Sequence, residues 1–106
     1  MILKLKKLFL LICVLSVHVI HAQITTISGT VIDSSNSMPL PEVTVVEKGT
    51  INGAITDFDG NYTIQISDEN AILQFSSLGY LDYEITVSGN TVINVALEES
   101  SESLDE

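Results

Sequence analysis

Apolar and polar residues alternate along most of the chain, from about residue 24 to residue 98. A period of two is typical of β-strands with one buried face, and no stretch there has the period of a helix. The apolar positions form about seven groups, each of which predicts one strand. We therefore expect an all-β fold, a seven-stranded antiparallel β-sandwich. The groups lie at residues 27–31, 43–45, 54–56, 62–67, 71–75, 81–87 and 93–97.

Turn-forming residues separate these groups. Asn52-Gly53 is a strong signal for a two-residue hairpin, because both residues tolerate positive φ. The sequence DFDG at 57–60 predicts a second turn and SGN at 88–90 a third. Within the group at 81–87, Leu81, Tyr83, Ile85 and Val87 are expected to share the buried face.

The first 22 residues do not follow this alternation. Three lysines (Lys4, Lys6 and Lys7) precede an apolar run from residue 8 to residue 20, and Ala22 ends the segment. This order predicts a secretory signal peptide over residues 1–22, cleaved to leave Gln23 first. Three alternatives have less support. A membrane-spanning helix needs a longer apolar run, and a first strand or helix of the domain does not suit the three lysines. A lipoprotein signal requires a small residue before its cysteine, which Cys13 lacks.

The net charge becomes more negative once residues 1–22 are set aside. The whole chain has 4 Lys+Arg against 14 Asp+Glu and a net charge of −10. Cleavage after residue 22 would remove three lysines and give −13, with Lys48 as the only basic side chain. Such a chain does not suit phosphate contact, so a nucleic-acid partner is excluded. We also expect no transmembrane segment in the mature chain.

The predicted mature chain lacks the residue types on which much catalysis depends. Arg is absent throughout, and Cys13, His18 and His21 all lie in the leader. Disulfides, thiol nucleophiles and imidazole bases are therefore excluded. We predict a sandwich domain over residues 23–98 and an acidic disordered tail or linker over 99–106. We expect no enzyme activity, no catalytic residue and no cofactor.

One segment has the residue types of a metal site. Asp57, Asp59 and Asn61 alternate and could offer oxygen ligands to Ca²⁺. An EF-hand loop requires Gly at its sixth position, where this chain has Tyr62. The competing interpretation is a β-turn in which Asp57 and Asn61 cap backbone groups and Gly60 takes positive φ.

Other chemistry has little support. Acids on polar strand faces are ordinarily solvated, and a thin domain lacks a deep cleft for an acid pair. Ser76 and Ser77 have no histidine to activate them. Tyr80 and Tyr83 could form an aromatic binding patch, although strand tyrosines are more often half-buried packing residues. Lys48 is expected to be an ordinary edge charge.

Four motifs in this order resemble a known family. They are ISGTVID at 27–33, MPLPEVTVVEKGTINGAITDFDGNYTI at 38–64, LQFSSLGY at 73–80 and TVINVALEE at 91–99. Together they resemble the carboxypeptidase-regulatory-like domain found at the N-terminus of SusC/RagA-type TonB-linked outer-membrane receptors. The resemblance implies a transthyretin-like sandwich without peptidase chemistry. Glu42 and Ser77 depart from the family pattern without threatening the fold.

The resemblance also implies a place in a larger machine. In such receptors a valine-rich TonB box, a plug and a barrel follow a segment like Ser103-Leu104-Asp105-Glu106. We expect this chain to be either the front of a receptor or a free-standing domain. The first alternative implies a non-catalytic accessory domain on the periplasmic side of the outer membrane. It would contact envelope proteins of the TonB system, or the plug and barrel in cis.

A free-standing domain implies a different function, a secreted or periplasmic module that binds glycan or Ca²⁺. An enzyme is the third hypothesis, because the transthyretin-like fold also hosts a hydrolase of a purine-degradation intermediate. That activity uses His and Arg, which the predicted mature chain lacks.

Overall fold

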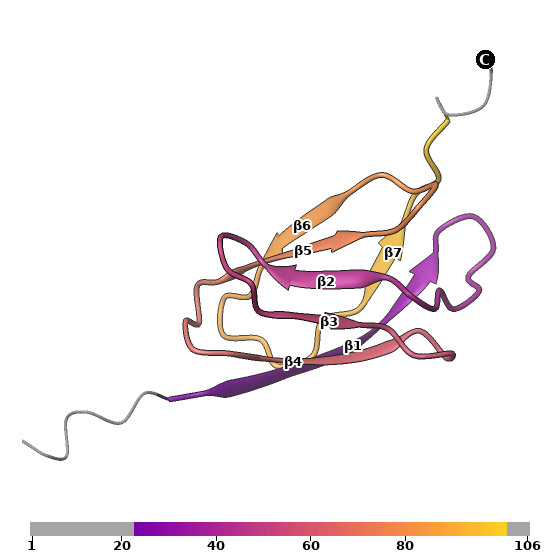
Figure 1. The fold of residues 1–106 in the computed structure, drawn as a ribbon. Helices are drawn as coiled ribbons and strands as arrows, with labels where there is room; N and C mark the ends of the chain where they lie inside the picture. Colours follow the sequence, from indigo (N-terminus) through magenta and orange to yellow (C-terminus); the bar gives the residue numbers. More distant parts are fainter. Residues whose placement is uncertain (1–22, 102–106) are drawn as a thin grey trace, which may run out of the picture.

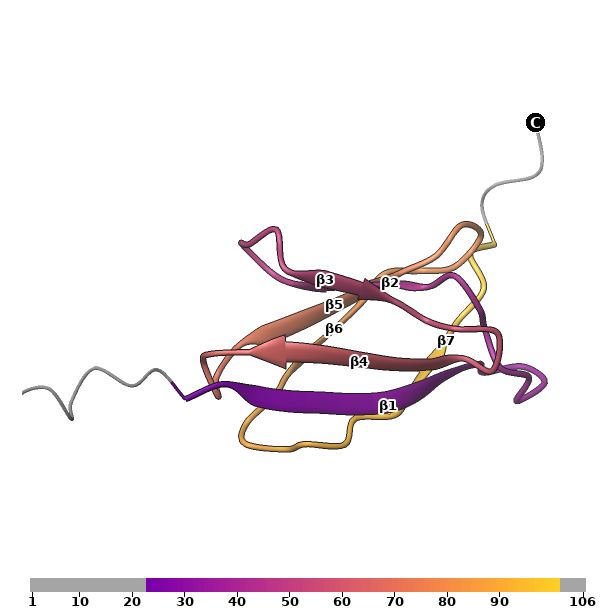
Figure 2. The same cartoon turned by 60° about the horizontal axis from the view of Figure 1, so that its bottom comes forward.

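The computed structural model describes residues 23–101, which form two β-sheets packed face to face (Figures 1 and 2). The strands are β1 (Thr25–Asp33), β2 (Thr44–Glu47), β3 (Gly53–Ile55), β4 (Asn61–Ile66), β5 (Ile72–Ser76), β6 (Tyr83–Thr86) and β7 (Val95–Leu97). One sheet has the order β4-β1-β7 and the other β3-β2-β5-β6. The predicted all-β, seven-stranded sandwich is confirmed. These residues contain no helix that could cross a membrane.

One strand pair departs from the antiparallel expectation. β7 runs parallel to β1, with Val31 opposite Val95 and Asp33 opposite Leu97. The other four pairings are antiparallel. The first and last strands of the domain are therefore neighbours that point in the same direction, as Figure 1 shows.

The core lies between the two sheets and is built by the predicted alternation. In β4, Tyr62, Ile64 and Ile66 are buried while the residues between them are exposed. Tyr62 meets Phe75 of the opposite sheet edge to face, with ring centroids 5.4 Å apart. The other core members follow the same pattern: Ile27, Val31, Val43, Val45, Ala71, Leu73, Val87, Ile93, Val95 and Leu97.

The predicted Asn52-Gly53 hairpin turn is wrong. The chain reverses at residues 48–50, where Gly49 has φ of 84° and the Thr50 amide donates to the Glu47 carbonyl at 3.0 Å. Gly53 is already the first residue of β3. Asn52 instead uses its side chain: Nδ2 donates to Glu47 Oε1 at 3.0 Å and to the carbonyl of Gln65, in β4, at 2.6 Å. A contact between strands of different sheets has replaced the local turn.

The first sheet holds a close backbone crossing at Gly29. The segment before β7 follows β1: the Ser28 amide donates to the Thr91 carbonyl at 3.0 Å, and the Ile93 amide donates to the Ser28 carbonyl at 2.9 Å. The Ile93 carbonyl then accepts a bond from Tyr62 Oη at 2.6 Å. A Cβ on Gly29 would lie 1.8 Å from that carbonyl oxygen, so this crossing requires glycine.

Two sequence predictions meet limits in the structure. The signal peptide at 1–22 lies outside the described residues, as does the last part of the tail, 102–106. The expected buried face of residues 81–87 is only partly buried. Val87 is 1% exposed, but Tyr83 is 42% and Leu81 51% exposed, because β6 is an edge strand and the described chain covers its first residues only in part.

Candidate functional site

Three segments meet at the end of the sandwich where the described chain leaves it. They are the loop after β1, the turn before β6 and the residues after β7 (Figure 1). The Leu81 amide donates to the Glu98 carbonyl at 2.8 Å, and the Ser100 amide donates to the Gly79 carbonyl at 2.9 Å. Tyr80 and Glu99 form an antiparallel bridge between them. The pairing thus continues beyond Leu97, and the exit segment has a fixed direction.

A buried carboxylate links this exit to β1. Asp33 is only 4% exposed. Its Oδ2 accepts a 2.6 Å bond from Tyr80 Oη, and its Oδ1 accepts bonds from the Ser35 hydroxyl at 2.6 Å and the Ser35 amide at 2.7 Å. Three donors stabilise the charge of a carboxylate that water reaches poorly. The exit segment is therefore connected to the first strand through one side-chain network.

The same contacts move both pKa values. Bonds from Ser35 and Tyr80 lower the pKa of Asp33, since they favour its charged form. The bond to Asp33 raises the pKa of Tyr80 to about 12, and burial adds to the effect. At neutral pH the pair is a neutral phenol donating to a carboxylate, which is a positioning contact and not an acid–base pair poised for catalysis.

The alternation contains a signal for this carboxylate. Ile27, Gly29, Val31 and Asp33 have the same parity in β1, so Asp33 continues the inward face. A charged residue at an inward position requires hydrogen-bond donors. Its donor Tyr80 is 47 residues away, which no local pattern indicates.

Two of the three predicted Ca²⁺ residues, Asp57 and Asn61, have structural partners for their side chains, and Asp59 is bonded through its backbone amide. Asp57 Oδ1 accepts 2.9 Å bonds from the amides of Asp59 and Asn61. Asn61 Oδ1 accepts a 2.7 Å bond from the Thr30 hydroxyl. Gly60 has φ of 79°, as the turn interpretation expects. Between residues 23 and 101 no three His, Cys, Asp or Glu side chains are grouped to hold a metal, and Ca²⁺ binding stays a prediction.

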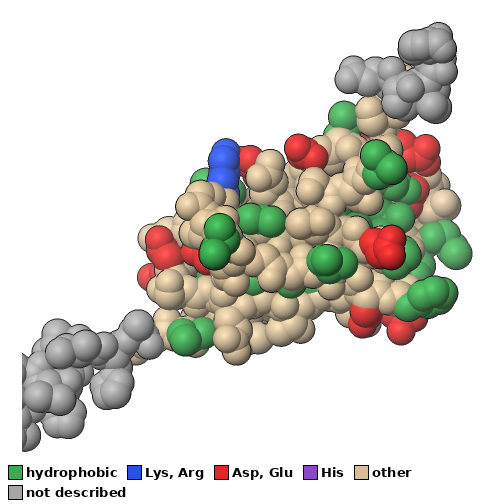
Figure 3. Space-filling view, viewed as in Figure 1, with side chains coloured by type: hydrophobic (Ala, Val, Ile, Leu, Met, Phe, Trp, Pro, Cys, Tyr) green, Lys and Arg blue, Asp and Glu red, His purple; other side chains and the backbone are tan. Residues whose placement is uncertain are grey.

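The two tyrosines expected to be packing residues do pack. Tyr80 is half-buried with its hydroxyl on Asp33, and the ring of Tyr83 lies 6.4 Å from that of Phe75. Lys48, at the end of β2, forms an exposed ion pair with Glu84 of β6 at 3.0 Å. Acidic side chains are spread over the face in Figure 3, and Lys48 is the only basic side chain among residues 23–101.

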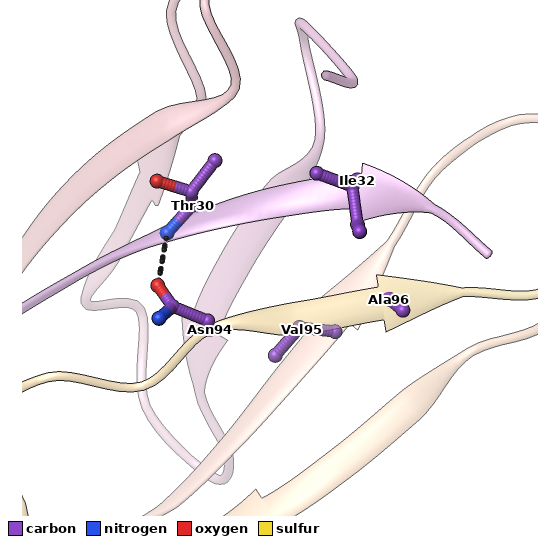
Figure 4. A pocket seen from close by; sticks show the side chains of 5 residues that line it. All are labelled: Thr30, Ile32, Asn94, Val95 and Ala96. Atoms are coloured by element: carbon purple, nitrogen blue, oxygen red, sulfur yellow. Dashed lines mark hydrogen bonds between the residues drawn. The ribbon is translucent and has the colours of Figure 1, made fainter. Parts of the chain in front are cut away.

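Shallow hollows occur on the outside of the sandwich. One of about 320 Å³ lies between β1 and β7, lined by Thr30, Ile32, Asn94, Val95 and Ala96 (Figure 4). Asn94 Oδ1 accepts a 2.9 Å bond from the Thr30 amide, so this side chain continues the strand pairing just before β7 begins. The lining has no titratable side chain, so the hollow contains no acid or base that could activate the hydroxyl of Thr30.

Comparison with known proteins decides the family. The model of the CarboxypepD_reg-like domain matches residues 27–106, three-quarters of the chain. The chain belongs to the carboxypeptidase-regulatory-like domain family. The strands and turns described above are thus those of a carboxypeptidase-regulatory-like domain, as the four motifs implied.

Similar proteins place such domains in much longer chains. TonB-dependent receptor P3 of Formosa agariphila is 43% identical over 93% of this chain and 10% of its own length. TonB-dependent receptor P26 of the same organism is 48% identical over 82% of this chain and 8% of its own. TonB-dependent receptor SusC of Bacteroides thetaiotaomicron is 39% identical over 80% and 8%. The chain thus spans about a tenth of the length of these curated relatives.

A solved structure shares the fold. It is a chain of a type II cohesin–X-dockerin complex from Acetivibrio cellulolyticus, with a TM-score of 0.54 and 26% identity. The match covers 68% of this carboxypeptidase-regulatory-like domain chain and 52% of the other chain.

Proposed function

We propose that this chain is a non-catalytic accessory domain at the N-terminus of a TonB-dependent outer-membrane nutrient receptor, acting by protein contact on the periplasmic side. One observation carries the proposal: the relatives named above are TonB-dependent receptors, and each shares with this chain only a stretch the size of one domain. Transport is then carried out by regions of the receptor that lie outside this shared domain.

The geometry suits a module placed in series with other parts. The described chain begins at one end of the sandwich and leaves at the other (Figures 1 and 2). At the exit, backbone pairing and the Asp33–Tyr80 bond fix the direction of residues 98–100. A rigid exit supports a role in positioning a neighbour, because a flexible one would transmit no orientation.

Residue content supports the absence of catalysis. Residues 23–101 contain no His, Cys or Arg, and their hollows are shallow. The one buried carboxylate, Asp33, is held by Tyr80 and Ser35 and does not face a cleft.

Deletion within a receptor that carries this domain tests the proposal. Removal of residues 27–99 should leave the receptor in the outer membrane but slow growth on its nutrient. A matched control replaces the domain with an unrelated sandwich of similar length, which preserves spacing and should not restore growth. Normal growth of the deletion strain would contradict the proposal, as would hydrolysis of a substrate by the purified chain.

A further inference from the structure

The sandwich has four edge strands, and the edge of β4 is blocked. Residues 61, 63 and 65 direct their backbone groups away from β1, as the bonds of Asn61 show. Its amide donates to Asp57 Oδ1 and its carbonyl accepts from the Asp57 amide, both at 2.9 Å. At the other end, the Gln65 carbonyl accepts from Asn52 Nδ2 at 2.6 Å. Along β4 only Thr63 keeps both its outward backbone amide and its outward carbonyl free, and one residue is too little for another strand to pair with.

The edges of β3 and β7 are short. Each strand has three residues. Asn52, directly before β3, is bonded to β4 of the other sheet. The outer edge of β7 is followed at once by the Glu98 carbonyl, which already accepts from Leu81. The phase of the pairing with β2 directs the backbone amides and carbonyls of Gly53 and Ile55 outward, but neither β3 nor β7 contains a charged residue that could select a partner.

β6 is an open edge that also carries a charged residue. The Val87 amide donates to the Ala71 carbonyl at 2.9 Å, which sets the phase of the pairing between β5 and β6. Bonded and non-bonded pairs alternate in an antiparallel ladder, so Glu84 and Thr86 point their amides and carbonyls away from β5. Within residues 23–101 no other strand pairs with this edge.

The inner face of β6 is also incomplete. Exposure rises from 1% at Val87 to 42% at Tyr83 and 51% at Leu81, so two large apolar side chains at the border of the core are about half uncovered. A groove of about 260 Å³ lies beside them, and Ala96 and Leu97 of β7 form its other side. A strand added to β6 would place every second side chain over this groove.

Charge identifies the chemistry of the added strand. Glu84 lies on the outer side of β6, and Asp82, directly before the strand, lines the groove together with Glu98. Figure 3 shows acidic side chains on several sides of the domain, the upper border included. Lys48, paired with Glu84, is the one opposing charge among residues 23–101. A second copy of β6 would set acids against acids, which destabilises a strand pair, whereas a basic strand would be attracted.

We propose that the β6 edge binds an extended segment of an envelope protein whose residues alternate between basic and apolar. The segment adds a strand antiparallel or parallel to β6, with backbone bonds to Glu84 and Thr86. Its apolar side chains cover Leu81 and Tyr83, and its basic side chains meet Asp82 and Glu84. The identity of the partner as an envelope protein rests on the proposed function, but the recognition chemistry does not.

A model peptide tests the edge directly. The probe is an acetylated and amidated seven-residue peptide of alternating lysine and valine, added to the full chain as it accumulates after export. Amide hydrogen exchange followed by NMR should show new protection at Glu84 and Thr86. The control peptide has the same sequence with alternate amides N-methylated, which keeps the charge but removes donors. It should bind at least about tenfold more weakly, because two or more backbone bonds are lost.

Two proline variants separate edge pairing from charge attraction. Thr86→Pro removes an outward amide of β6, and Thr63→Pro removes the equivalent outward amide of β4; neither removes a bond within its sheet. Thr86→Pro should weaken peptide binding about fivefold, because one backbone bond is lost, and Thr63→Pro should leave it within about twofold. If Thr86→Pro does not fold, the double variant Asp82→Asn, Glu84→Gln serves instead and should reduce both affinity and its salt dependence.

Other results would overturn the inference. Equal binding of the two peptides would mean that charge attraction alone holds the peptide. Protection at Thr63 or Ile55 would place the added strand on another edge. No binding at millimolar peptide would exclude strand addition to β6. These outcomes leave the proposed function standing, because receptor growth after deletion is measured without the peptide. Conversely, normal growth of the deletion strain would not explain away selective protection of Glu84 and Thr86.

Discussion

A methyl group at Gly29 should destabilise the domain strongly. The Cβ of Gly29→Ala would lie 1.8 Å from the Ile93 carbonyl oxygen, 2.7 Å from its carbon and 2.9 Å from a ring carbon of Tyr62. Two of these atoms belong to backbone, which cannot rotate away as a side chain can. The segment before β7 must therefore move by at least about 1 Å from β1.

The magnitude follows from what that movement breaks. The Tyr62 Oη bond to the Ile93 carbonyl, at 2.6 Å, and the Ile93 amide bond to Ser28, at 2.9 Å, both lie on the displaced segment. Each is worth about 1 kcal/mol, and overpacking adds about 1–3 kcal/mol. We expect a loss of about 3–5 kcal/mol from the free energy of unfolding. A domain of about 80 residues has only about 4–12 kcal/mol in total.

Urea unfolding followed by circular dichroism measures this loss. The matched control is Gly53→Ala in β3, where the added Cβ would lie 3.1 Å from its nearest neighbour, the Val45 carbonyl oxygen. Gly53 is exposed and its φ is not positive, so the control should change the free energy by less than about 1 kcal/mol. An unfolding midpoint for Gly29→Ala equal to that of the control would refute the steric account.

Three further variants test single contacts. Tyr62→Phe leaves a buried carbonyl without its donor and should cost about 1–3 kcal/mol in urea unfolding; an unchanged midpoint would contradict this. The pKa of Tyr80 is raised to about 12, so the contribution of Tyr80 to stability is present below pH 10 and is lost as the pH rises through 12. The pKa of Asp33 is lowered, so Asp33 stabilises the fold above the ordinary pKa of an aspartate and loses that effect as the pH falls. Tyr80→Phe should therefore flatten the alkaline limb of a plot of stability against pH, and an identical limb would rule out the contact. Lys48→Gln removes an exposed ion pair and should change stability by less than about 1 kcal/mol, with a smaller difference in high salt.

The alternation predicted what depends on one strand at a time. Tyr62, Ile64 and Ile66 are buried as their spacing indicates, since burial of one sheet face requires only that every second residue be apolar. The direction of β7 could not be predicted in this way. Parallel and antiparallel strands have the same period, so the pattern of Val95 and Leu97 fits either.

Features that depend on distant contacts escaped the sequence. Asn52 has the local propensity for a hairpin, but its amide binds Gln65 across the sandwich and the turn moves to Gly49. Leu81 has the right parity for the core, yet an edge position leaves it exposed. Parity did place Asp33 inward, while its donor Tyr80 could be found only in the folded chain.

The parallel pairing of β1 and β7 has a mechanical consequence. Tension applied at residue 23 and at residue 101 pulls two parallel neighbours in opposite senses along their common axis, because the chain begins at one end and leaves at the other (Figure 1). The bonds between Val31–Asp33 and Val95–Leu97 then carry the load together in shear. In an antiparallel pair of terminal strands the backbone hydrogen bonds would instead break one after another. The strand direction that the alternation left undetermined thus sets how much force this domain withstands before it yields.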